Sequence, residues 1–227
     1  CIRDRYLTIC QNGTSKDVKW DSENFQTQSG DGWSVTQLGA NEYQLTLTNA
    51  NLNKLYFRGG NWRIVLNGNN TLDGAGTFIA LEIYSGNITI NGNGSLKVDS
   101  RLKKNANGIS VGVDGSLTIM NGTINASASG NFSDTSAAIL VAKASGKYAV
   151  LVGGASNAVG EFSMSGGRLE ATGAGRNVFE VNRRSFTLSG GTIIANSTTN
   201  GFGFVSFLNP TTIEGDGRLE TSRLVLA

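Results

Sequence analysis

The sequence predicts an all-β fold: a right-handed parallel β-helix, or solenoid, with an irregular N-terminal cap. The main observation is a repeated unit in which two apolar residues flank a polar one, and a tight turn rich in Gly and Asn follows. In the last unit Thr211 takes the place of the first apolar residue. Such a strand–turn–strand repeat is typical of a stacked solenoid. The repeated units are residues 64–66, 88–90, 117–119, 162–164, 186–188 and 211–213.

The composition supports the same fold. The 227 residues include 31 Gly and a single Pro. Gly adopts the backbone conformations that tight turns need, whereas Pro would remove a hydrogen-bond donor from a strand ladder. Chains of this length often form one all-β domain, and no linker or helical period interrupts the sequence after residue 43.

The spacing of the repeats predicts which residues stack on one another. It places Leu66 over Ile90, and it places the residues that follow the turns in a second column. The longest step, from Ile119 to Met164, leaves two alternatives open: one long excursion or an extra coil.

Residues 1–42 do not fit the repeat, and the β-helix is expected to span residues 43–227. A solenoid has open ends whose apolar interior and unpaired strands must be covered. Residues 1–42 are therefore interpreted as an N-terminal capping segment, with a separate small domain as the alternative. Trp20 and Trp33 are expected in the core of this cap, because large aromatic side chains are mostly buried.

The two cysteines, Cys1 and Cys10, allow a disulfide or two unpaired thiols. A disulfide requires Cα atoms within about 7 Å, whereas residues 6–9 have the pattern of a strand that separates the two. Unpaired thiols are therefore favoured. An N-terminal Cys is also similar to that of a lipidated bacterial lipoprotein.

Charge and composition exclude several classes of function. The net charge is +2, and the isolated pairs Lys103–Lys104 and Arg183–Arg184 make no continuous basic stripe for nucleic acid. The longest apolar run is far shorter than the roughly 20 residues of a membrane-spanning helix, so no membrane insertion is expected. The absence of His removes the usual general base and the commonest zinc ligand, and no cofactor is expected.

The acidic residues do not predict an active site. Hydrolysis of a glycosidic bond needs two carboxyl groups about 5–9.5 Å apart. No two acids are adjacent in the sequence, and the predicted column after the turn never stacks one acid on another, so no catalytic residue is expected. That column is Asp73, Lys97, Asn125, Glu170, Ile194 and Glu220.

Another predicted column carries hydroxyl groups, which suit a solvated face of parallel strands. An ice-binding surface is the alternative, and it is less favoured because Arg168 and Arg218 interrupt a neighbouring column. The column is Val65, Thr89, Thr118, Ser163, Thr187 and Thr212.

Over about residues 33–221 the chain resembles the right-handed parallel β-helix modules of bacterial secreted and surface proteins, a carbohydrate-binding or adhesin-like domain family. The resemblance implies an extracellular or cell-surface location, a polysaccharide or host glycan as partner, and flanking domains in a longer chain. One branch of the family binds calcium at acidic corners, whereas residues 105–109 carry no carboxylate, so no metal site is expected. The resemblance rests on the segments NWRIVLNGNNTLDG, GNITINGNGSLKV, GSLTIMNGTINAS, GEFSMSGGRLEAT and SFTLSGGTIIANS.

The aromatic residues give the candidate binding site. Sugar rings stack on exposed aromatic faces while neighbouring polar side chains bind their hydroxyls. Trp62, beside the turn at residues 59–60, is expected to be exposed. The predicted carbohydrate-binding residues are Trp62, Arg63 and Tyr84.

These observations predict a non-catalytic extracellular binding module, carbohydrate-binding or adhesin-like, of a bacterial surface or secreted protein. A purely structural stalk or spacer is the main alternative. A polysaccharide lyase or hydrolase and an ice-binding protein are less favoured. Exposed aromatic residues along one face would distinguish glycan binding from a spacer.

Overall fold

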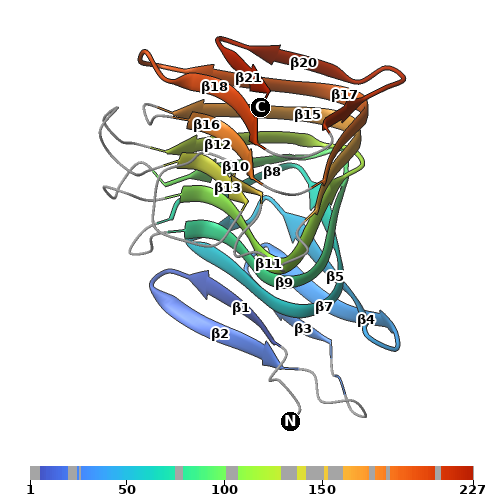
Figure 1. Ribbon diagram of the computed structural model, residues 1–227. Coiled ribbons are helices and arrows are strands. Elements are labelled where there is room, and N and C mark those ends of the chain that lie inside the picture. The colour runs from blue at the N-terminus through green and yellow to red at the C-terminus, as the bar shows by residue number, and fades with distance from the viewer. Residues whose placement is uncertain are drawn as a thin grey trace.

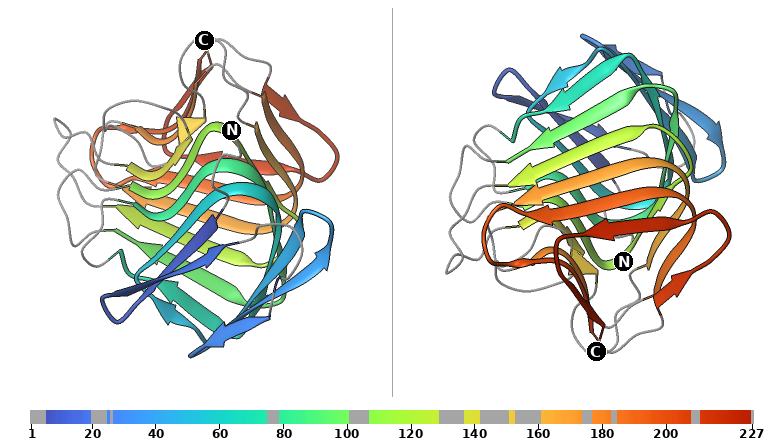
Figure 2. Two further views of the ribbon diagram at one scale, coloured as in Figure 1. Left: turned by 90° about the horizontal axis from the view of Figure 1, so that it is seen from below. Right: turned by 90° about the horizontal axis from the view of Figure 1, so that it is seen from above.

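The computed structural model is all-β, and its stacked strands confirm the predicted solenoid (Figures 1 and 2). The right hand of its winding stays a prediction. The structure describes residues 6–19, 25, 27–74, 79–100, 107–128, 137–141, 151–152, 161–173, 177–182, 185–207 and 211–226.

The strands of the solenoid stack in parallel on three faces, which we call faces A, B and C. Face A contains β7 (Lys54–Asn67), β9 (Ile79–Gly92), β11 (Asn107–Ile119), β13 (Ala137–Val141), β14 (Leu151–Val152), β16 (Asn177–Asn182), β18 (Phe202–Phe207) and β21 (Leu224–Leu226). Face B contains β5 (Glu42–Thr48), the later parts of β7, β9 and β11, the first parts of β15 (Glu161–Gly173) and β17 (Ser185–Ser197), and β19 (Thr211–Ile213). Face C contains β6 (Asn51–Leu52), β8 (Asn69–Leu72), β10 (Ser95–Asp99), β12 (Thr123–Ala128), the later parts of β15 and β17, and β20 (Arg218–Thr221).

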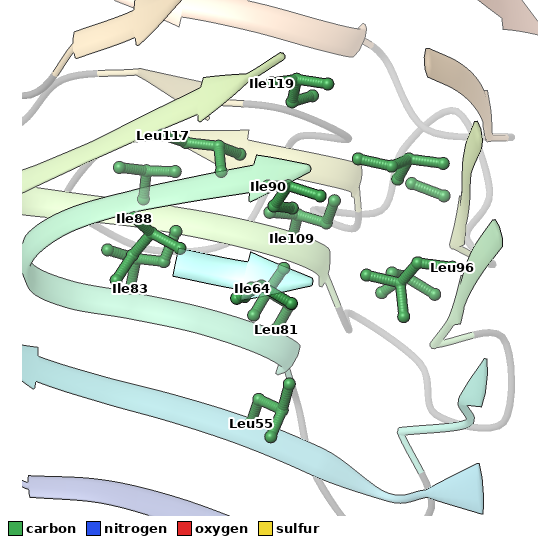
Figure 3. Close-up of a cluster of buried hydrophobic side chains, with 14 of the residues drawn as sticks. Leu55, Ile64, Leu81, Ile83, Ile88, Ile90, Leu96, Ile109, Leu117 and Ile119 are labelled. Carbon is green, nitrogen blue, oxygen red and sulfur yellow. The ribbon is translucent and has the colours of Figure 1, made fainter. Parts of the chain in front are cut away.

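Inward side chains form apolar columns along the bore of the solenoid. Strand residues alternate between the two faces of a sheet, so every second residue points inward. The close-up in Figure 3 shows two such columns, and each of their side chains is fully buried. Burying a Leu or Ile side chain stabilises a fold by about 1.5–3 kcal/mol. The columns are Leu55–Leu81–Ile109 on face A and Ile64–Ile90–Ile119 on face B.

Phenylalanines fill the bore in the later coils. Phe162 stacks on Phe186 with ring centroids 5.5 Å apart, and Phe179 stacks on Phe204 at 4.9 Å. The two stacks meet edge to face, with Phe179 and Phe186 at 5.7 Å. Such aromatic pairs add to the stabilisation that burial provides.

Antiparallel strands close the N-terminal end. β1 (Tyr6–Gln11) pairs with β2 (Thr14–Lys19) and with β7, while β4 (Trp33–Gly39) pairs with β3 (Gln28–Gly30) and with β5. Trp33 is buried here, as expected. Trp20 lies outside the described residues, and the division of the chain at residue 42 stays a prediction.

The register of the coil that contains β7 differs from the predicted one by two residues. Ile64 pairs with Ile90, and Leu66 lies beside Gly92. The predicted stacking of Leu66 on Ile90 is therefore wrong. The later steps are confirmed, because Ile90, Ile119, Met164, Leu188 and Ile213 form one column.

The same two-residue shift in register occurs on face C, where it involves Asn70. It lies opposite Leu96, and Leu72 pairs with Val98. The Asn70 side chain is buried, accepts a hydrogen bond from a backbone N–H of the preceding coil, and donates to carbonyls of its own and the next coil. These bonds offset the cost of burying an amide, which would otherwise be about 1–3 kcal/mol.

The long step between Ile119 and Met164 is an excursion rather than an extra coil. These two residues pair directly, and so do β12 and β15. The excursion adds β13 and β14 to face A, where both lie between β11 and β16.

Cys10 is a free thiol on β1, with its Sγ 3.1 Å from Ser15 Oγ. This agrees with the favoured alternative of unpaired thiols. Cys1 lies outside the described residues.

Candidate functional site

The three predicted sugar-binding residues do not form one site, and the expected exposure of Trp62 is wrong. Trp62 is only 2 % exposed. Its ring stacks on Tyr43 at 5.0 Å and meets Phe57 edge-on at 5.5 Å, and its Nε1 donates to the Gly59 carbonyl at 3.2 Å. The physical reason is the alternation of β7: Trp62 has the same inward phase as Ile64.

Arg63 and Tyr84 lie on different faces. Arg63 is exposed on face B, where it pairs with Gln44 and Thr89. It thus occupies the place in the hydroxyl column that was predicted for Val65. Tyr84 is 52 % exposed on β9, and of the three predicted residues it alone joins an exposed aromatic group.

That group consists of three tyrosines from distant parts of the chain. The ring centroids of Tyr6 and Tyr56 are 5.6 Å apart, and those of Tyr56 and Tyr84 are 6.4 Å apart. They meet because β1 pairs with β7 on one side and β9 pairs with β7 on the other. We call Tyr6, Tyr56, Tyr84 and the adjacent Arg58 the tyrosine platform.

The local sequence of β7 explains why the platform faces outward. Leu55 and Phe57 are fully buried, so the alternating residues Lys54, Tyr56 and Arg58 point to the outer surface. Tyr6, Tyr56 and Arg58 are not among the binding residues predicted from the sequence, although this alternation marks Tyr56 and Arg58 as outward residues.

Charged side chains lie against the three rings. The Cζ of Arg58 is 5.7 Å from the Tyr6 centroid and 5.6 Å from the Tyr84 centroid. Lys54 Nζ lies 5.2 Å from the Tyr56 centroid and 2.6 Å from Glu82 Oε2, so Glu82 neutralises it. Among the residues that the structure describes, no carboxylate lies within ion-pair distance of Arg58. The guanidinium of Arg58 can therefore donate to a ligand.

The packing of the platform perturbs its ionisation. Burial raises the pKa of Tyr56 to about 12, and the nearby Tyr6 and Glu82 add to the increase. Interaction with the Tyr6 side chain raises the pKa of Arg58. The Tyr56 phenol is therefore neutral and the Arg58 guanidinium is cationic over the physiological pH range.

The raised pKa of Tyr56 predicts a loss of stability at alkaline pH. Above the ordinary tyrosine value near 10, the unfolded chain releases the Tyr56 proton before the folded chain does. The stabilising contribution is therefore fully present below pH 10 and is lost as the pH rises toward 12. Urea unfolding at pH 9 and pH 11.5 is expected to show a smaller alkaline loss for Tyr56→Phe than for the wild type. Equal losses would show that Tyr56 ionises in the folded state as it does in the unfolded state.

The corrected register also changes the predicted column after the turns. Lys97 pairs with Thr71, so the predicted stacking of Asp73 on Lys97 is wrong. Asp73 accepts a hydrogen bond from Asn53 at 3.0 Å, and Asp99 lies 3.7 Å from Lys97. In the described part of the chain, no cluster of three or more His, Cys, Asp or Glu side chains could hold a metal ion.

A shallow hollow on face C is a second candidate for binding. It carries charged, amide and hydroxyl groups but no aromatic ring on which a sugar could stack, so the tyrosine platform is the stronger candidate. The hollow is lined by Lys97, Asn125, Ala126, Ser127, Glu170 and Thr172.

No protein-family model, curated protein or solved structure matches the chain. Over the described residues, no helix is long and apolar enough to cross a membrane. Function must therefore be argued from the geometry of the site itself.

Proposed function

We propose that the chain is a non-catalytic carbohydrate-binding module that uses the tyrosine platform as its binding surface. The observation that carries the proposal is the row of three tyrosine rings with Arg58 in contact with two of them. Sugar rings pack their C–H faces on aromatic rings, and a guanidinium donates hydrogen bonds to their oxygens. Tyr84 offers the largest free ring surface, because it is half exposed.

The tilt of the rings favours a flexible or twisted saccharide chain. Neighbouring rings of the platform are inclined by 45° and 47°. A flat polysaccharide surface would need coplanar rings, whereas a chain whose sugars turn from one to the next can contact each ring in succession. The proposed ligand is therefore a soluble polysaccharide or a host glycan.

The resemblance to bacterial surface modules supports an extracellular or cell-surface location for this function. In that setting the solenoid would display the platform beside further domains of a longer chain.

Glycan binding by the purified chain tests the proposal. We expect saturable binding on a glycan array, and Tyr84→Ala and Arg58→Ala are each expected to weaken it at least about tenfold, or about 1.4 kcal/mol. Truncation removes one stacking face in the first variant and one donor group in the second.

Leu38→Ala provides a matched control, since Leu38 is 53 % exposed on β4 and lies outside the platform. Its affinity should equal that of the wild type. Glycan binding that survives both Tyr84→Ala and Arg58→Ala would show that the ligand binds elsewhere.

Two other functions have distinct outcomes in the same experiment. A structural spacer, favoured by the regular stacking of the coils, predicts no binding to any glycan. A hydrolase that uses Asp73 and Asp99 as its two carboxylates predicts release of reducing sugar that Asp99→Asn abolishes. The engagement of these carboxylates by Asn53 and Lys97 favours a structural role for them.

A further inference from the structure

Aromatic rings and cations alternate across four neighbouring strands at the tyrosine platform. Strands β2, β1, β7 and β9 lie side by side in this order. Tyr6 of β1 pairs with Lys19 of β2 on one side and with Arg58 of β7 on the other. The ring of Tyr84 lies 5.6 Å from the guanidinium carbon of Arg58. Facing residues of paired strands project from the same side of a sheet, so two cations flank the ring of Tyr6 on the outer surface.

Both cations of this row are accessible to an anion. Val18 is fully buried, so the next residue, Lys19, points to the outer surface, where it is exposed. Within the described ranges of the chain, neither Lys19 nor Arg58 has a carboxylate at ion-pair distance. The contacts of Arg58 with two tyrosine rings also restrict its guanidinium, so less conformational entropy is lost when a ligand binds it.

The carboxylates near the platform lie in the next row of outward residues and have partners there. Asp17 of β2 accepts a hydrogen bond from Thr8 at 2.6 Å. Glu82 of β9 lies 2.6 Å from Lys54, and Tyr56 lies between Thr8 and Glu82. A ligand anion bound at the row of cations would therefore meet no carboxylate in that row, while hydroxyl groups of the same ligand could donate to the carboxylates of the next row.

We infer that the tyrosine platform prefers acidic saccharides, whose carboxylate or sulfate group binds Arg58 and Lys19 while a sugar ring packs on Tyr6 or Tyr84. The inference rests on the proposed function and narrows its class of ligand. A guanidinium binds two oxygens of an anionic group through two parallel hydrogen bonds, which are stronger than its bonds to a neutral hydroxyl. A neutral saccharide would leave the two cations without this interaction.

Matched pairs of glycans test the preference. Each acidic glycan that the wild type binds on the array is compared with the same glycan after carboxyl reduction or desulfation, which removes the charge and keeps the sugar chain. We expect the neutral form to bind at least about tenfold more weakly. The treatment that causes the loss identifies the anion as a carboxylate or a sulfate. Added salt should narrow the difference, because it screens exposed charges.

The outcomes separate this inference from the proposed function. Equal affinity for the charged and neutral forms, or binding to neutral glycans only, would overturn the acidic preference and leave glycan binding by the platform intact. A wild type that binds no glycan at all would overturn the proposed function, and the preference with it.

Two lysines of β2 provide a variant and its matched control. Lys19→Gln should weaken binding of the acidic form about threefold and leave binding of the neutral form unchanged. Lys16→Gln removes the same charge from the same strand. Lys16 shares the side of β2 on which Val18 is buried, and its Nζ lies 5.1 Å from the Trp33 ring, so this variant should bind like the wild type.

Removing both cations of the row gives the sharpest result. The double variant Lys19→Gln/Arg58→Gln should bind the acidic and neutral forms of a glycan with about equal affinity, since no cation then flanks Tyr6 in this row. A preference that persists in the double variant, or an equal loss in Lys16→Gln and Lys19→Gln, would show that the anionic group does not bind between Lys19 and Arg58.

Discussion

Replacing Trp62 with alanine is expected to lower the free energy of unfolding by about 3–5 kcal/mol. The Trp62 ring is buried between Tyr43 and Phe57, where it stacks on one ring and meets the other edge-on. Alanine would leave a cavity that the hydrogen-bonded strands on either side of β7 cannot close. The midpoint of urea unfolding, compared with that of the wild type at an unchanged slope, measures the loss.

Tyr84→Ala provides the contrast, because Tyr84 is 52 % exposed. Its effect on stability should stay below about 1 kcal/mol, while its effect on glycan binding should be large. The two aromatic residues that the sequence predicts for the binding site thus separate into a core residue and a surface residue. A small loss of stability in Trp62→Ala would contradict the burial of its ring.

The fold could be predicted because each coil of the solenoid corresponds to one repeat of the sequence. Every coil needs an inward apolar pair and a tight turn, so segments such as residues 117–119 and 186–188 mark their own positions. The alternation of residues along β7 also predicts that Trp62 is buried, because Trp62, Ile64 and Leu66 point to the same side of the strand. The prediction failed where proximity to the turn at residues 59–60 was given more weight than this alternation.

The register of β7 could not be read from the same pattern. A slip of two residues keeps every inward residue inward, so stacking Leu66 or Ile64 on Ile90 satisfies the apolar pattern equally well. The difference depends on Asn70, which occupies an inward position with its amide fully hydrogen-bonded. A polar residue at an apolar position of the repeat gives no signal to an alignment of apolar residues.

The tyrosine platform could not be predicted without knowing where the N-terminal strand β1 lies. Tyr6 reaches Tyr56 only because β1 adds to the edge of β7 in antiparallel direction. This pairing lies outside the repeat, so the spacing of the coils does not predict it. The contact between Tyr56 and Tyr84 does follow from the solenoid, since β7 and β9 are consecutive layers of face A.

Gly92→Ala is expected to lower the free energy of unfolding by about 2–5 kcal/mol. Gly92 has φ of 114°, and a Cβ there would lie 2.4 Å from the Leu66 carbonyl oxygen. That oxygen accepts a hydrogen bond from the Gly94 N–H at 3.0 Å, so Leu66 cannot withdraw without breaking the corner. A strained backbone costs about 1–2 kcal/mol, and overpacking adds about 1–3 kcal/mol.

Gly13→Ala is the matched control, because Gly13 has φ of 74° but nothing within 4 Å of the added Cβ. Urea unfolding should show the control losing only the backbone contribution. Equal losses in the two variants would mean that the close approach of the added Cβ to the Leu66 carbonyl oxygen costs nothing beyond the backbone strain.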